Sequence, residues 1–335
     1  VTVMKGCNER CSFCIVPTTR GPERYRPARE ILSEVEALVT GGVREITLLG
    51  QTVNSYRDPE QRLEAEARRL AAGSSFGERR ADDDESEFST LLVRIAERAP
   101  ALLRLRYTSP HPRHLTRSLI RAHAELSVLP RHVHLPVQSG SDRVLRRMIR
   151  RYNVAEYHER VAALRDAVPG VTLSTDVIVG FPGETEQDFE ATLQLVDALQ
   201  FTNLYGFKYS ARPFTPALRL GDDVPEVEKS RRLDELFRVA DAIRHRHLRS
   251  RVGAVEQVMV EGRGRAEEFS GRAEHNEIVH IQSPRVDPTA RLVSVRIEQA
   301  FKNSLAGALV DESGLPPWEL TPMSLPRRSL TVLAS

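Results

Sequence analysis

Cysteine is scarce in this sequence, and the few cysteines stand close together. The 335 residues contain three, all of them between Cys7 and Cys14. Three thiols within one short stretch cannot build a disulfide framework, which excludes the small disulfide-rich secreted proteins and is typical of a reducing compartment. We therefore expect a cytoplasmic protein.

Long apolar runs are missing as well. No run of about 18 apolar residues occurs, so the sequence predicts no membrane-spanning helix and no membrane partner. The opening stretch, Val1–Lys5, is too short to form the apolar part of a signal peptide. Its first four residues are typical of a buried strand, and because the chain starts within that strand without a methionine, we expect a further segment upstream.

A large net charge of either sign is also absent. The chain has 48 Lys and Arg residues against 46 Asp and Glu, a formal net charge of +2, so its overall charge does not indicate a nucleic-acid partner. Two local segments, 143–151 and 244–251, are dense in arginine and could neutralise phosphates. A solvated helix face, or pairing with nearby acids, explains either segment equally well.

The three cysteines that are present form a C-x3-C-x2-C pattern: Cys7, Cys11 and Cys14. Soft thiolates at this spacing can converge on zinc, Cu(I) or an iron–sulfur centre. Structural zinc and iron–sulfur clusters usually take four protein ligands, so three cysteines leave one position vacant, where a substrate can bind. The spacing favours an open [4Fe–4S] site. A zinc site completed by a distant histidine such as His111, or three unligated thiols, remain the alternatives.

Strands and helices alternate over most of the chain. Six predicted strands are separated by helical patterns: Val1–Met4, Ile46–Leu49, Leu103–Tyr107, His132–Leu135, Thr172–Val179 and Asn203–Tyr209. Strict alternation favours parallel strands with right-handed crossovers, and six units suit a partial (β/α)6 barrel that is open on one side. The unusual loops all follow strand C-termini, where α/β barrels place their active sites.

Three segments depart from this alternation. Residues 57–87, which fall within the predicted α/β barrel of residues 1–251, are polar and predict an inserted surface loop. Residues 252–310 contain short alternating strands with Gly-rich turns at Gly262–Gly264 and Gly271, which predict a small all-β barrel. Residues 311–335 predict an extended or disordered tail.

These motifs resemble a known family. The cysteine pattern, with the aromatic Phe13 before its last cysteine, is similar to the signature of radical S-adenosylmethionine (SAM) enzymes. Over roughly residues 1–310 the chain resembles the MiaB family of tRNA methylthiotransferases. The resemblance is carried by Arg24–Pro27, Leu48–Ser55, Thr108–Pro112, His134–Ser141 and Val179–Glu184, together with the cysteine stretch.

The resemblance implies a radical SAM barrel in which Cys7, Cys11 and Cys14 hold a [4Fe–4S] cluster and SAM binds the open iron. The positions that it implies for SAM contacts are Phe13 at the adenine, Gly50 and Gln51 at the amino acid part, Ser174 and Asp176 at the ribose, Gly180 beside the adenine and Arg212 at the carboxylate. The ordinary alternatives are a core aromatic for Phe13, a structural hydrogen bond for Ser174 and Asp176, and a strand-to-helix turn for Gly180.

Two positions depart from the family pattern. Val177 replaces the first glycine of the G-x-I-x-G-x-x-E element that includes Gly180 and Glu184. Phe214 stands where many relatives have glycine after Arg-Pro. The shape of the loop that carries Arg212 therefore does not follow from the family pattern.

The predicted C-terminal barrel is similar to a TRAM module, an OB-like RNA-binding barrel. It contains seven Arg and Lys residues against eight Asp and Glu. RNA binding would therefore require its cations to gather on one face, and the candidates are Arg263, Arg265, Arg272 and Lys302.

The function that the resemblance implies is the addition of a methylthio group to C2 of N6-isopentenyladenosine beside the tRNA anticodon. The expected partners are the anticodon stem-loop and an electron donor such as flavodoxin or ferredoxin. Family members draw the sulfur from a second iron–sulfur cluster on three further cysteines, which this chain lacks, so we expect that cluster only in a longer parent protein. The alternatives are a truncated, non-catalytic RNA-binding or regulatory form and an enzyme acting on threonylcarbamoyl-adenosine.

Overall fold

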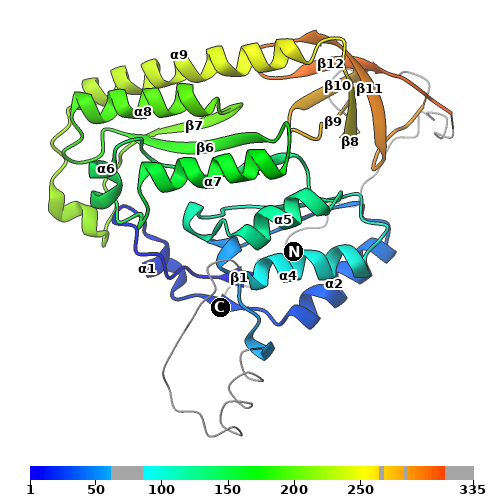
Figure 1. Ribbon diagram of the computed structural model, residues 1–335, viewed down its shortest axis with the longest axis horizontal. Coiled ribbons are helices and arrows are strands. Elements are labelled where there is room, and N and C mark those ends of the chain that lie inside the picture. Colours follow the sequence, from blue (N-terminus) through cyan, green and yellow to red (C-terminus); the bar gives the residue numbers. More distant parts are fainter. Residues whose placement is uncertain (62–85, 264–267, 283–285, 314–335) are drawn as a thin grey trace, which may run out of the picture.

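The computed structural model describes residues 1–61, 86–263, 268–282 and 286–313 (Figure 1). Most of the predicted insertion, the predicted tail from residue 314 and Arg265 lie outside these ranges. The chain forms an α/β part followed by a closed five-stranded β-barrel, which confirms the expected fold class. No helix among the described residues is long and apolar enough to cross a membrane.

The α/β part contains seven short strands among the described residues. They are β1 (Met4–Lys5), β2 (Arg24–Tyr25), β3 (Glu45–Leu48), β4 (Arg104–Tyr107), β5 (His132–His134), β6 (Thr172–Val179) and β7 (Asn203–Lys208). Two parallel sheets result, one of β3 and β4 and the other of β5, β6 and β7. No ladder joins β4 to β5 within the described residues, so the expected barrel is divided at this point.

The predicted first strand has two different partners. Val3 donates a backbone hydrogen bond to Leu49 and Leu49 donates one to Val1, at 3.0 and 2.8 Å, and the bridge between Thr2 and Leu49 is parallel, as predicted. Met4 and Lys5 instead pair antiparallel with β2, a strand that the sequence did not predict. The cysteine stretch lies between β1 and α1, in the connection that leads to β2.

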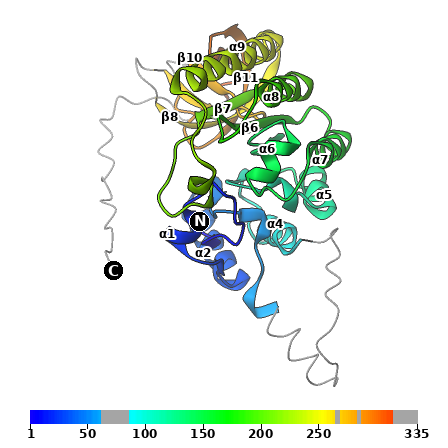
Figure 2. The same cartoon turned by 90° about the vertical axis from the view of Figure 1, so that its left-hand side faces the viewer.

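Helices cover the outer face of the strands. They are α1 (Val16–Arg20), α2 (Ala28–Thr40), α4 (Glu87–Arg98), α5 (Arg117–Glu125), α6 (Asp142–Arg147), α7 (Val154–Ala167), α8 (Glu186–Leu199) and α9 (Glu226–Ser250). Figure 2 shows α2, α4, α5, α7 and α8 following one another around the outside. Their apolar stripes bury Leu32, Phe88, Leu119, Tyr157 and Phe189 in one core.

Side-chain caps define where several helices start. Ser86, the N-cap of α4, accepts a hydrogen bond from the Phe88 N–H, and capping boxes open α7 at Asn153 and α8 at Thr185. Each such cap stabilises a helix by about 1 kcal/mol. At the edges of the predicted insertion, Asp58 is buried and Glu87 is the first residue of α4.

The C-terminal barrel is TRAM-like and closes in the order β10-β12-β11-β8-β9. Its strands are β8 (Val255–Arg263), β9 (Phe269–Arg272), β10 (Ile278–Gln282), β11 (Leu292–Ala300) and β12 (Leu305–Leu309). The predicted turn at Gly271 is wrong, because Gly271 lies inside β9. A Cβ there would be 2.2 Å from the Met259 carbonyl oxygen, so glycine permits close pairing of β8 and β9 rather than a turn.

The barrel docks against the edge of the α/β part from which β4, β5 and β6 begin. The buried Arg104 of β4 donates to the Arg272 carbonyl oxygen at 2.6 Å, and Arg106 donates to the Asn276 side chain at 3.0 Å. Thr172, the first residue of β6, donates to the His275 carbonyl oxygen at 3.1 Å. The end of β9 and the segment that follows it therefore accept three hydrogen bonds from β4 and β6.

Candidate iron–sulfur and cofactor site

The cysteine loop is held by backbone geometry at its start. Gly6 has φ +80°, and a Cβ on it would lie 2.1 Å from the Pro22 carbonyl oxygen, so only glycine fits. The Gly6 N–H donates to the Gln51 side-chain oxygen at 2.6 Å. Cys7 then donates its backbone N–H to Gly21 at 3.2 Å, and Cys14 donates to Cys11 at 3.1 Å.

The three thiols lie in a mostly buried environment. Cys7 and Cys11 are buried and Cys14 is half-buried, and burial raises the pKa of the Cys7 and Cys14 thiols. The Cys7 sulfur lies 3.0 Å from the Thr52 hydroxyl, and the Cys11 sulfur accepts a hydrogen bond from the Arg150 guanidinium at 3.3 Å. The loop thus gathers three sulfur ligands beside one buried cation.

This donor set fits an iron–sulfur cluster better than zinc. Tetrahedral zinc, with Zn–S distances of about 2.3 Å, would bring the sulfurs within about 4 Å of one another. Among the described residues the three sulfurs do not all come within 4.8 Å, and His111 groups with Glu9 and His114 instead. The zinc alternative with His111 as fourth ligand is therefore not supported. Cys7, Cys11 and Cys14 have the softness and number of ligands that a cluster with one open iron needs.

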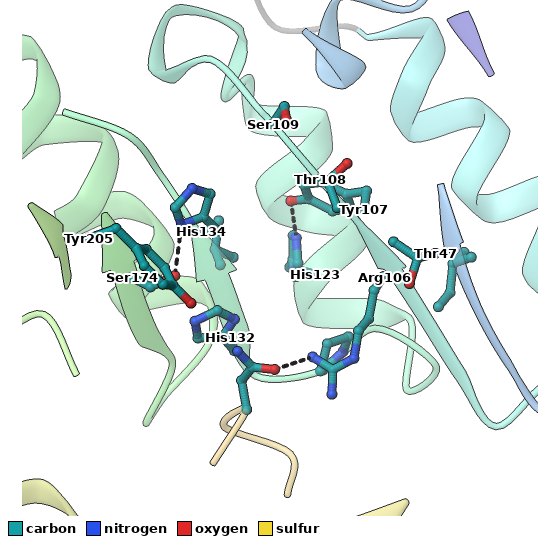
Figure 3. Close-up of a pocket in the computed structure, with 14 residues that line it drawn as sticks. Thr47, Arg106, Tyr107, Thr108, Ser109, His123, His132, His134, Ser174 and Tyr205 are labelled. Carbon is teal, nitrogen blue, oxygen red and sulfur yellow. Dashed lines mark hydrogen bonds between the residues drawn. The ribbon is translucent and has the colours of Figure 1, made fainter. Parts of the chain in front are cut away.

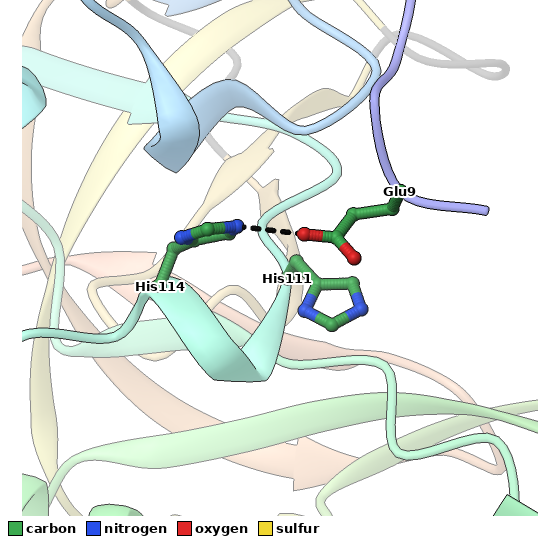
Figure 4. A group of neighbouring side chains, drawn as sticks. All are labelled: Glu9, His111 and His114. Atoms are coloured by element: carbon green, nitrogen blue, oxygen red, sulfur yellow. Dashed lines mark hydrogen bonds and ion pairs between the residues drawn. The ribbon is translucent and has the colours of Figure 1, made fainter. Parts of the chain in front are cut away.

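Glu9, which belongs to the cysteine loop, forms a compact group with His111 and His114 (Figure 4). The Nε2 nitrogen of His114 lies 3.0 Å from Glu9, and guanidinium nitrogens of Arg113 and Arg151 lie 3.8 and 3.9 Å from that carboxylate. Burial raises the pKa of Glu9, but the His114 hydrogen bond and the neighbouring cations outweigh it and lower the net value. Two guanidiniums already neutralise Glu9, so the group fixes the cysteine loop to the segment after β4.

Three predicted SAM contacts lie close to this loop. Phe13 is half-buried, with its ring 6.5 Å from that of Phe181 in an edge-to-face arrangement. A Cβ on Gly50 would lie 2.6 Å from the Met4 side chain, and Gln51 holds Gly6 as described above. Gly50 and Gln51 thus have structural roles in shaping the cysteine loop, which the sequence did not indicate.

Ser174 and Asp176 share a third partner on the neighbouring strand. The Ser174 hydroxyl lies 2.9 Å from Nδ1 of His134, and Asp176 lies 3.6 Å from Nε2 of the same ring. His134 was part of a family motif but was not predicted as a site residue. The parallel register of β5 and β6 places it opposite Ser174.

A cavity of about 390 Å³ occupies the gap between β4 and β5 (Figure 3). Its polar lining includes Arg106, His132, His134, Ser174 and Tyr205. Figure 3 shows Ser174 and Tyr205 on one side and Arg106 and Thr47 on the other. Burial lowers the pKa of His132 to about 3, so this imidazole is neutral. The sequence placed His132 in a strand but did not predict it as a site residue, because its neighbours across the gap come from a distant strand.

Gly180 lies in the loop after β6, and the side chain of Lys229 from α9 packs against it. Its φ is +68°, and a Cβ would lie 2.3 Å from the side chain of the buried Lys229. Lys229 is itself paired with Asp222 at 2.7 Å. Glycine is therefore required at 180 by close packing as well as by backbone conformation, and Val177 in place of the first family glycine is buried on β6.

Arg212 lies in a loop after β7. Among the described residues, no interaction of its side chain connects it with the other predicted SAM contacts. It is exposed, and its carbonyl oxygen accepts a hydrogen bond from the Thr215 hydroxyl at 2.8 Å. Phe214 in the same loop has φ +64° and is 81% exposed. Phe214 thus adopts the left-handed conformation that glycine favours.

The predicted RNA contacts have different surroundings. Arg263 lies over the Phe269 ring, at 6.0 Å from its centre, and Arg272 pairs with Glu261 at 3.2 Å. Lys302 has a side chain that is 78% exposed and lies 3.5 Å from Asp241 of α9. Arg265 lies outside the described residues.

Comparison with known proteins defines the class. Residues 1–196 match the Radical SAM superfamily, more than half of the chain, and the chain belongs to that family. This membership implies a [4Fe–4S] cluster and SAM as cofactors.

The most similar relatives narrow the class further. The chain is 60% identical over 320 residues to the tRNA-2-methylthio-N(6)-dimethylallyladenosine synthase of Sorangium cellulosum, covering 93% of this chain and 62% of that protein. It is 45% identical over 309 residues to the protein of that name from Acidithiobacillus ferrooxidans strain ATCC 53993, covering 92% of this chain and 64% of the relative. The chain thus spans less than two thirds of the length of these relatives.

A solved structure gives a more distant likeness. The radical SAM methyltransferase TsrM from Kitasatospora setae, with cobalamin and a [4Fe–4S] cluster bound, aligns with a TM-score of 0.47 and 18% identity. The alignment covers 65% of this chain and 35% of that one.

Proposed function

We propose that this chain is the radical SAM and RNA-binding part of a tRNA methylthiotransferase that modifies C2 of N6-isopentenyladenosine beside the anticodon. The observation that carries the proposal is the 60% identity to the Sorangium cellulosum synthase over 93% of the chain. The cysteine loop between β1 and α1 supports the same chemistry, because its three ligands would leave one iron open for SAM.

When bound and reduced by one electron, the cluster and SAM supply a 5′-deoxyadenosyl radical. The chain's own residues position SAM: Cys7, Cys11 and Cys14 hold the cluster, and Phe13 packs against the adenine. Ser174 and Asp176 meet the ribose hydroxyls, with His134 holding both side chains. Gly50, Gln51 and the Gly180 loop would supply backbone groups, and Arg212 would pair with the SAM carboxylate.

The sulfur source is the second part of the proposal. All three cysteines of the chain serve the first cluster. Sulfur insertion therefore requires a second cluster on cysteines of a longer protein, in the portion of the relatives that this chain does not span. A flavodoxin or ferredoxin supplies the electron.

The TRAM-like barrel binds the tRNA in this proposal. Lys302 is the best placed of the predicted contacts, because its side chain is mostly exposed on the turn between β11 and β12. Arg272 faces the docked segment between β9 and β10, where its guanidinium donates to the Asn276 carbonyl oxygen at 3.3 Å. We therefore assign Arg272 to the domain contact and Arg263, Arg265 and Lys302 to RNA.

Two half-reactions test the proposal. The reconstituted chain, reduced with dithionite, should release 5′-deoxyadenosine from SAM and form no 2-methylthio nucleoside on isopentenylated tRNA. Fusing the remaining N-terminal portion of the Sorangium cellulosum relative should restore the product, measured by mass spectrometry of digested tRNA. A fusion carrying Cys11→Ala is the matched control and should form neither product.

Three outcomes would contradict the proposal. A 2-methylthio product from the chain alone would show that the sulfur donor is wrongly assigned. A fusion active only on threonylcarbamoyl-adenosine would show that this nucleoside, and not N6-isopentenyladenosine, is the substrate. A fusion that binds tRNA but never cleaves SAM would support the non-catalytic RNA-binding form.

A further inference from the structure

Arg150 is a buried arginine whose guanidinium contacts a cysteine of the site. Only 5% of the residue is exposed. Nη1 donates to the Cys11 sulfur at 3.3 Å, Nη2 donates to the Pro136 carbonyl oxygen at 3.0 Å, and Nε donates to the Tyr152 hydroxyl at 3.2 Å. The guanidinium is therefore fixed on three sides.

The supports of Arg150 are themselves rigid. The Tyr152 hydroxyl donates to the Val137 carbonyl oxygen at 2.7 Å, and the Tyr152 ring packs edge-to-face on His111. Ile149 and Arg151, the residues on either side of Arg150, have φ of +58° and +56°. A left-handed conformation is unfavourable for a β-branched residue such as Ile149, and such strain gathers at functional sites. The backbone here bends to send Arg150 inward.

No carboxylate within ion-pair distance neutralises Arg150 among the described residues. The comparison is the buried Arg232, which pairs with Glu184 at 2.9 Å. The oxygen partners of Arg150 are a carbonyl and a hydroxyl, and its remaining partner is the Cys11 sulfur. Because burying an unpaired charge is unfavourable, the arrangement calls for an anion at the cysteine loop.

We propose that Arg150 is the counter-charge of the iron–sulfur cluster held by Cys7, Cys11 and Cys14, and that it raises the reduction potential of that cluster. Three thiolates leave a [4Fe–4S] cluster with a net negative charge, and an added electron makes it more negative. A fixed cation at a ligand sulfur therefore stabilises the reduced form more than the oxidised form. Hydrogen bonds to sulfur and burial are established ways in which proteins set such potentials.

The test is a redox titration of the anaerobically reconstituted chain, followed by electron paramagnetic resonance. One electron from the reductant enters the cluster, and no bond is made or broken. Arg150→Met removes the charge and keeps an unbranched side chain that fills part of the same space, whereas Arg150→Lys keeps the charge. We expect Arg150→Met to lower the equilibrium constant of reduction about tenfold, or about 59 mV for one electron. Arg150→Lys should lie between Arg150→Met and the wild type.

The matched control is Arg146→Gln. Arg146 is an exposed cation four residues earlier on α6, and solvent screens its charge. The reduction potential of the cluster in Arg146→Gln should equal that of the wild type. Iron content is measured for every variant, so that potentials are compared only between loaded proteins.

A second measurement covers the case in which Arg150→Met fails to retain iron. Wild-type protein grown with ¹⁵N-guanidino arginine should show a ¹⁵N coupling to the reduced cluster in pulsed resonance, and Arg150→Lys should lose it. Absence of that coupling, or a potential unchanged in loaded Arg150→Met, would overturn the inference. The inference rests on the cluster of the proposed function but not on its substrate, because no readout here uses tRNA.

Discussion

The Nη1 nitrogen of Arg232 lies 2.9 Å from the Oε2 oxygen of Glu184, and both side chains are almost completely buried. The same carboxylate oxygen accepts a hydrogen bond from the Gly180 N–H. Arg232 belongs to α9 and Gly180 to the loop that follows β6. One ion pair therefore connects the long helix with the loop that we assign to SAM.

The first prediction concerns pH. Burial raises the pKa of Glu184 from 4.5 to about 7 and outweighs Gly180 and Arg232, which favour the anion. The pKa of Glu184 is thus higher in the folded protein than in the unfolded chain. The contribution of Glu184 to the free energy of unfolding is therefore complete below about pH 4.5 and is lost as the pH rises through about 7. In the wild type, this titration should lower the free energy of unfolding by up to roughly 3 kcal/mol over that pH range, and Glu184→Gln should remove this loss. Denaturant unfolding at pH 4.5 and pH 8 measures it.

Glu186→Gln is the control for this prediction. Glu186 pairs with the same α9 segment, but its side chain is half-exposed. Its variant should keep the pH dependence of the wild type. If Glu184→Gln also keeps it, the carboxyl group does not titrate in this range.

The second prediction concerns iron. Anaerobic reconstitution should load about four irons per chain, with a brown charge-transfer band, and Cys11→Ala should abolish both. Ser12→Ala is the neighbouring control; it removes a buried hydroxyl that donates to the Arg147 carbonyl oxygen at 2.7 Å, and it should still load iron. Elemental analysis is the measurement, and stoichiometric zinc without iron would refute the assignment.

The third prediction concerns RNA. Binding to an anticodon stem-loop should weaken with salt by about 0.7 to 0.9 log units per log unit for each phosphate neutralised. Lys302→Gln should reduce that slope by about one such contact. The control is Arg98→Gln at the end of α4, because Arg98 pairs with Glu36 of α2. The salt dependence of binding is measured by titration. If it has the same slope in both variants, Lys302 does not contact the RNA.

The fourth prediction concerns the barrel. Gly271→Ala should destabilise the protein by about 3 kcal/mol, because the added methyl group would meet the backbone of Met259 and Val260. Gly41→Ala, at the end of α2, is the control, since Gly41 has φ −73° and its nearest contact would be 3.3 Å. Thermal unfolding of both variants measures the difference, and similar melting temperatures would show that the barrel absorbs the methyl group.

Local patterns in the sequence were sufficient for the cysteine loop and for the order of β3 to β7. The spacing of Cys7, Cys11 and Cys14 is short enough for one loop to bring them together, whatever surrounds it. The alternation of strands and helices from β3 to β7 is likewise visible in apolar periodicity, which reflects the near neighbours of each residue. Strand β9 was missed because Gly271 has no side chain to contribute to such a pattern.

Contacts between distant residues were decided only by the tertiary structure. Arg150 and Cys11 are 139 positions apart, so no local pattern could show that a guanidinium faces the Cys11 sulfur. The same holds for Gln51 on Gly6 and for the cavity between β4 and β5, which depends on two strands failing to pair. Chemistry follows from residue type and short spacing, whereas charge balance and shape follow from packing, which brings remote segments together.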